Sequence, residues 1–214
     1  MSELLDPVGA YDAAFTAGRA ALVRVGEPDS DFGVHTWSAE PDAVDLALFV
    51  EPCDAPTLDV GCGPGRLVGE LSARGVTSLG IDVSEEAVRQ TRGRGADALR
   101  LDVFDRVPGE GSWQWALLAD GNLGIGGDPV RLLARVSDLL APGGRVIVEV
   151  AAPGTGIRHE QRRLRIDDDL SEPFPWSVVG LDAIDSVARV AGLHRVHQEH
   201  AFGRHAVTLV RLAA

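Results

Sequence analysis

The chain has 214 residues, of which 45% are hydrophobic and 24% charged, a composition typical of one globular domain. Its 32 acidic and 20 basic side chains give a formal net charge of -12 at pH 7. This charge repels a phosphate backbone, so DNA and structured RNA are not expected as substrates unless a local basic patch overrides it.

The sequence shows no signal for export or membrane insertion. Its first residues carry Glu3, Asp6 and Asp12 in place of a basic leader, and no apolar run approaches the roughly 20 residues that span a bilayer. The two cysteines, Cys53 and Cys62, form neither a disulfide framework nor a C-x-x-C pair. We therefore expect a cytoplasmic protein with no membrane partner and no metal site.

Two helices are predicted ahead of the first strand. Small and apolar residues recur at helical spacing from Asp6 to Val25, after which Gly26 to Ser30 breaks the pattern. A second periodic stretch runs from Glu40 to Val50, with Pro41 in its first turn.

Short apolar runs then alternate with helical patterns, which predicts a layered α/β sandwich around a parallel sheet. The expected strands are Thr57–Val60, Ser78–Ile81, Ala98–Leu101, Trp115–Ala119 and Val146–Ala151. The expected helices between them are Leu67–Arg74, Ser84–Arg92 and Pro129–Leu140. Near the C-terminus, a helix is expected at Leu181–Ala191, followed by two strands at Arg195–Ala201 and Ala206–Leu212. The connection between these two strands is too short for parallel pairing, so they are expected to pair antiparallel.

The segment Asp59-Val-Gly-Cys-Gly-Pro-Gly-Arg66 lies where a buried strand gives way to a helix. Its three glycines let a ligand approach the backbone, and the amides that start the helix suit a polar or anionic group. A nicotinamide-binding loop needs a third glycine where Arg66 stands, and Pro64 removes an amide that a pyrophosphate would use. The P-loop pattern is absent, so a plain tight turn is the remaining alternative.

Leu58–Gly65 resembles motif I of the class I S-adenosylmethionine-dependent methyltransferases. Asp82, at the end of the second strand, matches the acidic residue that binds the ribose hydroxyls in that family, although it could instead cap a helix. Leu101–Phe104 resembles the adenine site, and Leu139–Gly144 resembles the turn before the fifth strand. These four segments occur in the order that the family shows.

The resemblance implies a three-layer sandwich around a seven-stranded, mostly parallel sheet whose last strand is antiparallel, with N-terminal helices. We expect one domain over residues 1–214, in which residues 1–54 are a helical extension or lid and residues 55–214 the cofactor-binding core. The implied cofactor is S-adenosylmethionine, and the product S-adenosylhomocysteine. The implied cofactor-binding residues are Asp59, Gly61, Cys62, Gly63, Gly65, Arg66, Asp82, Val83, Asp102, Val103, Phe104, Leu118 and Ala119.

A glycine-rich segment, Asp120–Asp128, follows the fourth strand, where ligands bind in open α/β sheets. Its glycines indicate either close approach of another group or mobility. It departs from the Asn/Asp-Pro-Pro-aromatic motif of amino-directed nucleic-acid methyltransferases, which again disfavours a DNA base as acceptor. Methyl transfer needs alignment first and a base only if the acceptor holds its proton tightly. The candidate bases are Asp120, His35 and His159.

The acceptor pocket of the resembled family lies between N-terminal residues and the segment after the fifth strand. The predicted acceptor contacts are Trp37, Asn122, Arg158 and Trp176, although Trp176 fits a core position equally well. The arginines at 158, 162, 163 and 165 could bind an anionic acceptor. The three aspartates at 167–169 that follow them favour a solvated edge strand instead.

The sequence therefore predicts transfer of a methyl group to O, N or S of a small molecule by a monomer or homodimer, without a nucleic-acid partner. Three alternatives stay open: other chemistry on the same cofactor, a non-catalytic binding module, and a nicotinamide-dependent reductase. Neither the acceptor nor its reactive atom follows from the sequence, because function depends on the site rather than on the sheet.

Overall fold

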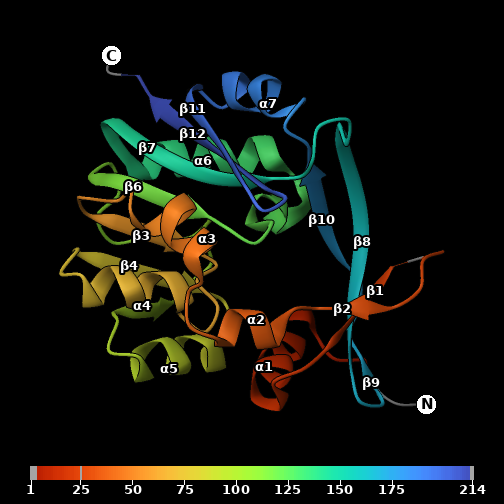
Figure 1. Ribbon diagram of the computed structural model, residues 1–214. Helices are drawn as coiled ribbons and strands as arrows, with labels where there is room; N and C mark the ends of the chain where they lie inside the picture. Colours follow the sequence, from red (N-terminus) through yellow and green to blue (C-terminus); the bar gives the residue numbers. More distant parts are fainter. Residues whose placement is uncertain (1–3, 25, 213–214) are drawn as a thin grey trace.

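The computed structural model describes residues 4–24 and 26–212, which form two sheets (Figure 1). The larger sheet has seven strands in the order β11-β12-β7-β6-β3-β4-β5. Its strands are β3 (Thr57–Val60), β4 (Ser78–Asp82), β5 (Ala98–Arg100), β6 (Trp113–Leu118), β7 (Leu140–Val150), β11 (Leu193–Ala201) and β12 (Arg204–Arg211). β3 to β7 run parallel, whereas β12 runs antiparallel between β7 and β11. The predicted α/β sheet with an antiparallel last strand is therefore confirmed.

Alternating side chains of the central strand β6 divide the core of this sheet. Ala116 and Leu118 point to the face covered by α6 (Pro129–Leu139) and α7 (Ile184–Val190). Trp115 and Leu117 point to the opposite face, where α4 (Arg66–Ala73) and the turn η1 (Leu46–Val50) pack. Each face is thus buried by its own helices, and the predicted three layers follow.

The N-terminal segment is only partly helical, which corrects the prediction of a helix over Asp6–Val25. Helix α1 (Pro7–Ala17) begins at the cap Asp6 and ends at Gly18, whose φ of 68° is left-handed. The following residues form β1 (Ala21–Arg24), and Val25 lies outside the described residues. The short elements β2 (Ser30–Asp31), α2 (Val34–Ser38) and α3 (Ala43–Asp45) lead into η1.

A second sheet, which the sequence did not predict, joins the N-terminal segment to residues 157–179. It contains β10 (Phe174–Val179), β8 (Ile157–Ile166), β1 and β2 in that order, and β9 (Asp169–Leu170) pairs with β8. The register places Leu22 opposite Leu164, so an N-terminal strand pairs with one more than a hundred residues later. In Figure 1 this sheet stands to one side of the larger sheet, close to α1.

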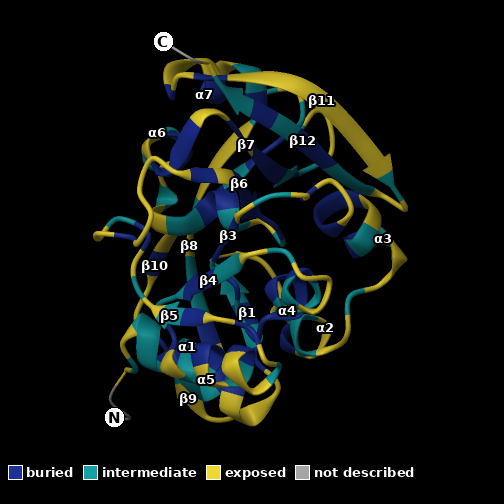
Figure 2. Ribbon diagram, turned by 90° about the vertical axis from the view of Figure 1, so that its left-hand side faces the viewer, coloured by how far each residue is buried: buried dark blue, intermediate teal, exposed yellow. Residues whose placement is uncertain are grey.

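Burial is uneven over the molecule (Figure 2). The strands at the centre of the larger sheet are buried, whereas the edge strand β11 is exposed over most of its length. Phe202, in the turn after β11, is 93% exposed. Within residues 4–24 and 26–212, no helix is long and apolar enough to cross a membrane.

Candidate functional site

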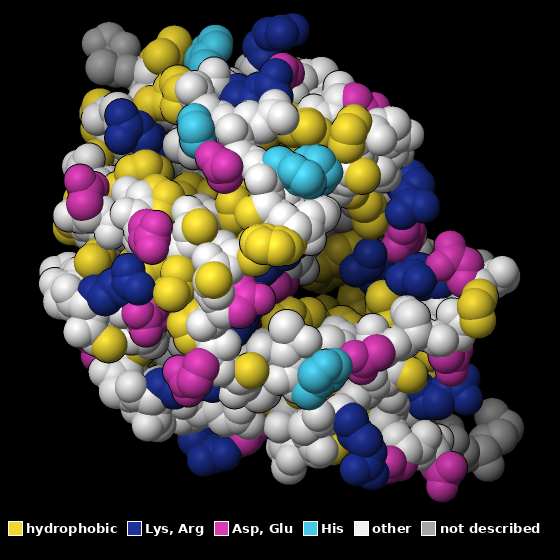
Figure 3. Space-filling view, viewed as in Figure 1, with side chains coloured by type: hydrophobic (Ala, Val, Ile, Leu, Met, Phe, Trp, Pro, Cys, Tyr) yellow, Lys and Arg dark blue, Asp and Glu magenta, His cyan; other side chains and the backbone are white. Residues whose placement is uncertain are grey.

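A cavity of about 830 Å³ lies between the carboxyl ends of β3, β4 and β6 and the second sheet. It is visible as a hollow with apolar walls near the centre of Figure 3. All predicted cofactor-binding residues except Gly65 and Leu118 line it. They are Asp59, Gly61, Cys62, Gly63, Arg66, Asp82, Val83, Asp102, Val103, Phe104 and Ala119.

The glycine loop after β3 exposes its backbone to this cavity. Gly61 and Gly63 have left-handed φ values of 69° and 53°. A Cβ on Gly61 would lie 2.8 Å from Nδ2 of Asn122, which donates hydrogen bonds to the carbonyls of Val60 and Gly61. A Cβ on Gly63 would meet only the Phe15 ring, at 3.9 Å, so it would stand in the open cavity. Gly61 thus permits local packing, and Gly63 leaves room for a ligand.

Gly65 and Leu118 serve the fold instead. A Cβ on Gly65 would lie 2.7 Å from the Thr91 side chain, so this glycine lets α4 start against α5 (Glu85–Gly93). Leu118 is fully buried among the side chains between β6 and α6. Neither Gly65 nor Leu118 lines the cavity.

The carboxylate of Asp82 is held at the end of β4 by two backbone amides. Its Oδ2 accepts from the Gly63 amide and its Oδ1 from the Ser84 amide, both at 2.9 Å. Burial raises the pKa of Asp82, and these two hydrogen bonds partly offset that effect. At the end of β3, burial and then the nearby Asp120 carboxylate raise the pKa of Asp59 to about 7.

The end of β5 forms one end of the cavity. Oδ1 of Asp102 accepts a hydrogen bond of 2.9 Å from the Phe104 amide. The Arg131 guanidinium lies 4.0 Å from the centroid of the Phe104 ring. A Cβ on Gly126 would lie 3.1 Å from the same ring, so Phe104 is held between α6 and the turn η2 (Asn122–Gly127).

A buried network of charges surrounds Asp120 at the edge of the cavity. Arg66, with its side chain 4% exposed, forms ion pairs with Asp45 and with Asp120, the latter at 2.5 Å. Arg204 pairs with Asp45 at 2.7 Å, with Asp120 at 3.4 Å and with Glu149 at 2.8 Å. Glu149 also accepts a hydrogen bond of 2.7 Å from the Asp120 amide. The guanidinium of Arg66 is therefore paired with neighbouring carboxylates, although Arg66 lines the cavity.

This network was not predicted, because its members come from separate segments of the chain. Asp45 ends α3, Glu149 lies in β7 and Arg204 opens β12. Although burial alone would raise the pKa of Asp45, its ion pairs with Arg66 and Arg204 hold that pKa below the usual value. Burial raises the pKa of Asp120, and the Arg66 guanidinium partly offsets it.

Of the three candidate bases, only Asp120 lines the cavity. His35 is 70% exposed on α2, with its Nδ1 3.3 Å from Asp31. Nδ1 of His159 lies 2.9 Å from the Ser177 hydroxyl and 3.1 Å from the Gly127 carbonyl, so this residue ties β8 to η2. The structure does not bring either histidine to the site.

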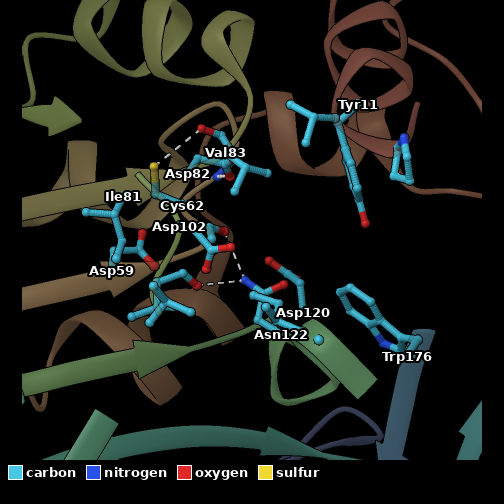
Figure 4. A pocket seen from close by; sticks show the side chains of 18 of the residues that line it. Tyr11, Asp59, Cys62, Ile81, Asp82, Val83, Asp102, Asp120, Asn122 and Trp176 are labelled. Atoms are coloured by element: carbon cyan, nitrogen blue, oxygen red, sulfur yellow. Dashed lines mark hydrogen bonds between the residues drawn. The ribbon is translucent and has the colours of Figure 1, made fainter. Parts of the chain in front are cut away.

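Aromatic side chains form the wall opposite the cofactor motifs. Figure 4 shows Tyr11 and Trp176 across the cavity from Asp59, Cys62 and Asp82. The predicted acceptor residues Trp37, Asn122 and Trp176 all line the cavity, whereas Arg158 lies outside it. The wall comprises Tyr11, Phe15, Phe32, Trp37, Phe174 and Trp176, and Arg162 adjoins it. We call these six side chains the aromatic wall.

The glycines of η2 permit close approach of this wall. A Cβ on Gly124 would lie 2.1 Å from Nε1 of Trp176, and one on Gly127 would lie 2.7 Å from Pro175. The glycine-rich pattern thus reflects packing of η2 against β10. Tyr11 and Phe15 were not predicted as site residues, because in the sequence they match the apolar face of a helix.

Comparison with known proteins gives matches of two kinds. Residues 57–144 match a family model described as a methyltransferase domain. The trans-aconitate 2-methyltransferase of Paracidovorax citrulli is 28% identical over 140 residues, which cover 64% of this chain and 52% of that protein. The chain spans between about a quarter and about half the length of the curated relatives that it matches.

Solved structures resemble the chain over nearly its whole length. A SAM-dependent methyltransferase from Bacteroides fragilis in complex with S-adenosyl-L-homocysteine matches with a TM-score of 0.78 and 21% identity, covering 98% of each chain. The 1,6-didemethyltoxoflavin-N1-methyltransferase of Burkholderia thailandensis matches with a TM-score of 0.61 and 16% identity, covering 90% of this chain and 96% of that one. At these identities the likeness establishes a shared fold.

Proposed function

We propose that this chain is a class I S-adenosylmethionine-dependent methyltransferase, which transfers a methyl group from S-adenosylmethionine to a small-molecule acceptor. One observation carries the proposal: a single cavity joins the glycine loop and the strand-end carboxylates to the aromatic wall. Such a cavity has room for a cofactor at one end and an acceptor at the other.

The residues present fit this cofactor. Beside Gly63 there is open space along the backbone, which suits the methionine portion. Asp82 uses one lone pair on each oxygen for backbone amides and keeps others for two ribose hydroxyls. The Val103 amide has no acceptor within the described part of the chain, so it is free to donate to an adenine ring nitrogen. Oδ2 of Asp102 could accept from the adenine amino group.

When bound, S-adenosylmethionine supplies a methyl group on a sulfonium, which leaves by in-line displacement. The chain contributes mainly alignment: Asn122 fixes the glycine loop, and the buried charge network fixes the turn at Asp120. Both carboxylate oxygens of Asp120 already face arginines, so we assign Asp120 a positioning role rather than that of a general base.

Names of relatives support a small acceptor. Matching proteins are named for methylation of trans-aconitate and of 1,6-didemethyltoxoflavin, and a sugar N-methyltransferase also shares the fold. O, N and S of a small molecule remain the acceptor atoms that we propose for this chain. The net charge of -12 further supports an acceptor other than nucleic acid.

We further propose that the chain acts as one domain in which residues 1–54 cover the acceptor end of the cavity. Tyr11, Phe15 and Trp37 support this role, because they line the cavity from the N-terminal side. A cytoplasmic location is supported by Cys53 and Cys62, which are buried free thiols. The protein would act as a monomer or homodimer.

Asp82 should be needed for cofactor binding. Isothermal titration should show S-adenosylmethionine and S-adenosylhomocysteine binding to the wild-type protein, and Asp82→Ala should weaken both by roughly tenfold to a hundredfold. The reason is the loss of a buried acceptor for hydroxyl groups at the end of β4. Asp138→Ala, an exposed acid at the end of α6, is the matched control and should bind normally. Binding of NADH instead of the sulfonium would refute the proposal.

The second prediction concerns Asp120. After a screen of metabolite extracts with methyl-labelled cofactor has identified an acceptor, Asp120→Asn should keep kcat within about tenfold, because the amide oxygen can still accept from Arg66. Asp120→Leu leaves Arg66 without this partner and should weaken cofactor binding strongly. If Asp120 were a general base, both variants would lose about 10²–10⁴ in kcat. Wild-type activity would also decrease as the pH is lowered through the pKa of Asp120, because the carboxylate would become protonated.

A further inference from the structure

Side chains of strand β8 alternate between a partly buried inner face and an exposed outer face. Glu160, Arg162 and Leu164 lie on the inner face, and the register places Arg162 opposite Phe174 of β10 and Arg24 of β1. Arg158 and Arg165 are about half exposed and do not line the cavity. Of the arginines on this strand, only Arg162 does so. Alternation places Arg163 and Arg165 on the other face, and Arg158 shares the face of Arg162 but is exposed near the start of the strand, so one cation remains for the site.

The guanidinium of Arg162 is fixed by two neighbours. Its Nε donates a hydrogen bond of 2.9 Å to Glu160, and its Cζ lies 5.0 Å from the centroid of the Trp176 ring. The side chain is 14% exposed. Neither terminal nitrogen donates a hydrogen bond to any residue in the described part of the chain. A largely buried guanidinium therefore keeps both terminal NH₂ groups available beside the cavity.

Two terminal NH₂ groups of a guanidinium match the two oxygens of a carboxylate. Burial lowers the pKa of Arg162 and the Glu160 carboxylate counteracts this, so the group stays a cation. Glu160 balances part of the charge of Arg162, and the neighbouring Arg24 is itself paired with Glu27 at 2.5 Å, so the site suits a singly charged carboxylate better than a phosphate dianion. The rings around it favour a planar or apolar body over a highly hydrated one.

We propose that the methyl acceptor carries a carboxylate, which Arg162 binds, attached to a planar or apolar body held by the aromatic wall. This inference rests on the proposed function. The Arg162 site adjoins the part of the cavity beside η2. Arg162 lies over the ring of Trp176, and Trp176 packs directly on Gly124 of η2. An acceptor anchored at Arg162 therefore extends along η2 toward Asn122 and the glycine loop.

The test uses matched pairs of small probes. Isothermal titration would compare benzoate with benzamide, phenylacetate with phenylacetamide, and indole-3-acetate with indole-3-acetamide, each with and without saturating S-adenosylhomocysteine. The wild-type protein should bind at least one carboxylate about tenfold or more tightly than its amide, as expected for a charge-assisted pair. Arg162→Met, which keeps the apolar stem, should reduce that preference to less than about twofold.

Two further variants complete the design. Arg162→Lys keeps the charge without the planar fork and should show an intermediate preference. Arg165→Met removes an arginine of the same strand that does not line the cavity, and should leave the preference unchanged. S-adenosylhomocysteine affinity, measured on every variant, checks that the cofactor end is intact.

Three results would overturn the inference: equal affinity for both members of every pair, failure of all three carboxylates to bind, or a preference that survives in Arg162→Met. Normal binding of S-adenosylhomocysteine in those cases leaves the proposed function standing. If the cofactor failed to bind the wild-type protein, the proposed function would be refuted. The titrations without cofactor would still measure whether the cavity prefers carboxylates.

Discussion

Arg66→Met should be strongly destabilising, by about 3–5 kcal/mol in the free energy of unfolding. The substitution leaves Asp45 and Asp120 with Arg204 as their remaining cation, and Asp45 is 3% exposed in its side chain. Denaturant unfolding at pH 7 measures the loss. Because the buried carboxylates would then bind protons more readily in the folded state than in the unfolded one, the deficit should shrink as pH falls toward 5.

The matched control is Arg74→Met, because Arg74 follows α4 and pairs with Glu70 at 2.7 Å with 39% of its side chain exposed. An exposed pair of this kind contributes at most about 1 kcal/mol. Combining Asp45→Asn with Arg66→Met should recover part of the loss, since one of the stranded charges is removed. Equal effects of Arg66→Met and Arg74→Met would show that the buried network does not support the fold.

Gly124→Ala should damage the acceptor end while sparing the cofactor end. The new Cβ would overlap the Trp176 indole, whose Nε1 would be 2.1 Å away, so the ring must leave its place in the aromatic wall. Overpacking of this kind costs about 1–3 kcal/mol. We expect lower stability, an altered tryptophan fluorescence spectrum, and affinity for S-adenosylhomocysteine within about threefold of the wild-type value.

Gly93→Ala provides the comparison, because a Cβ on Gly93, near the end of α5, meets nothing within 4 Å. A glycine-to-alanine change in such a position is neutral or stabilising by up to about 1 kcal/mol. If Gly124→Ala behaved like Gly93→Ala in both stability and fluorescence, then close packing would not explain the glycine at 124. Mobility of η2, the other interpretation of its glycines, would then be favoured.

The core of the larger sheet could be predicted because β3, β4 and β6 are short apolar runs and each precedes a helical pattern. The second sheet could not. Strand β8 is rich in charged residues, and its partner β1 continues the apolar pattern of α1 without a break other than Gly18. Pairing across more than a hundred residues leaves no local period in the sequence, so the helix was predicted to extend to Val25.

The same distinction explains which site residues could be predicted. Asp82 and Asp102 follow strands of one parallel sheet, whose carboxyl ends must meet at one edge. Arg66 lies at that edge too, but its partners Asp45 and Asp120 are 21 and 54 positions away by their numbering, so no motif indicates the network. For His35, the sequence does not indicate the face of α2 from which the side chain projects. For Arg158, which shares a face of β8 with Arg162, it does not indicate which part of the strand lies beside the cavity.

The pairing of β1 with β8 also bears on how such a protein changes its acceptor over evolutionary time. The cofactor end is built from consecutive elements between β3 and η2, whereas the aromatic wall combines α1 and α2 with β10, which follows η2 in the chain. The shape of the proposed acceptor pocket therefore depends on two stretches of the chain, residues 11–37 and 174–176, which lie more than a hundred positions apart. The cofactor end can be inherited unchanged throughout.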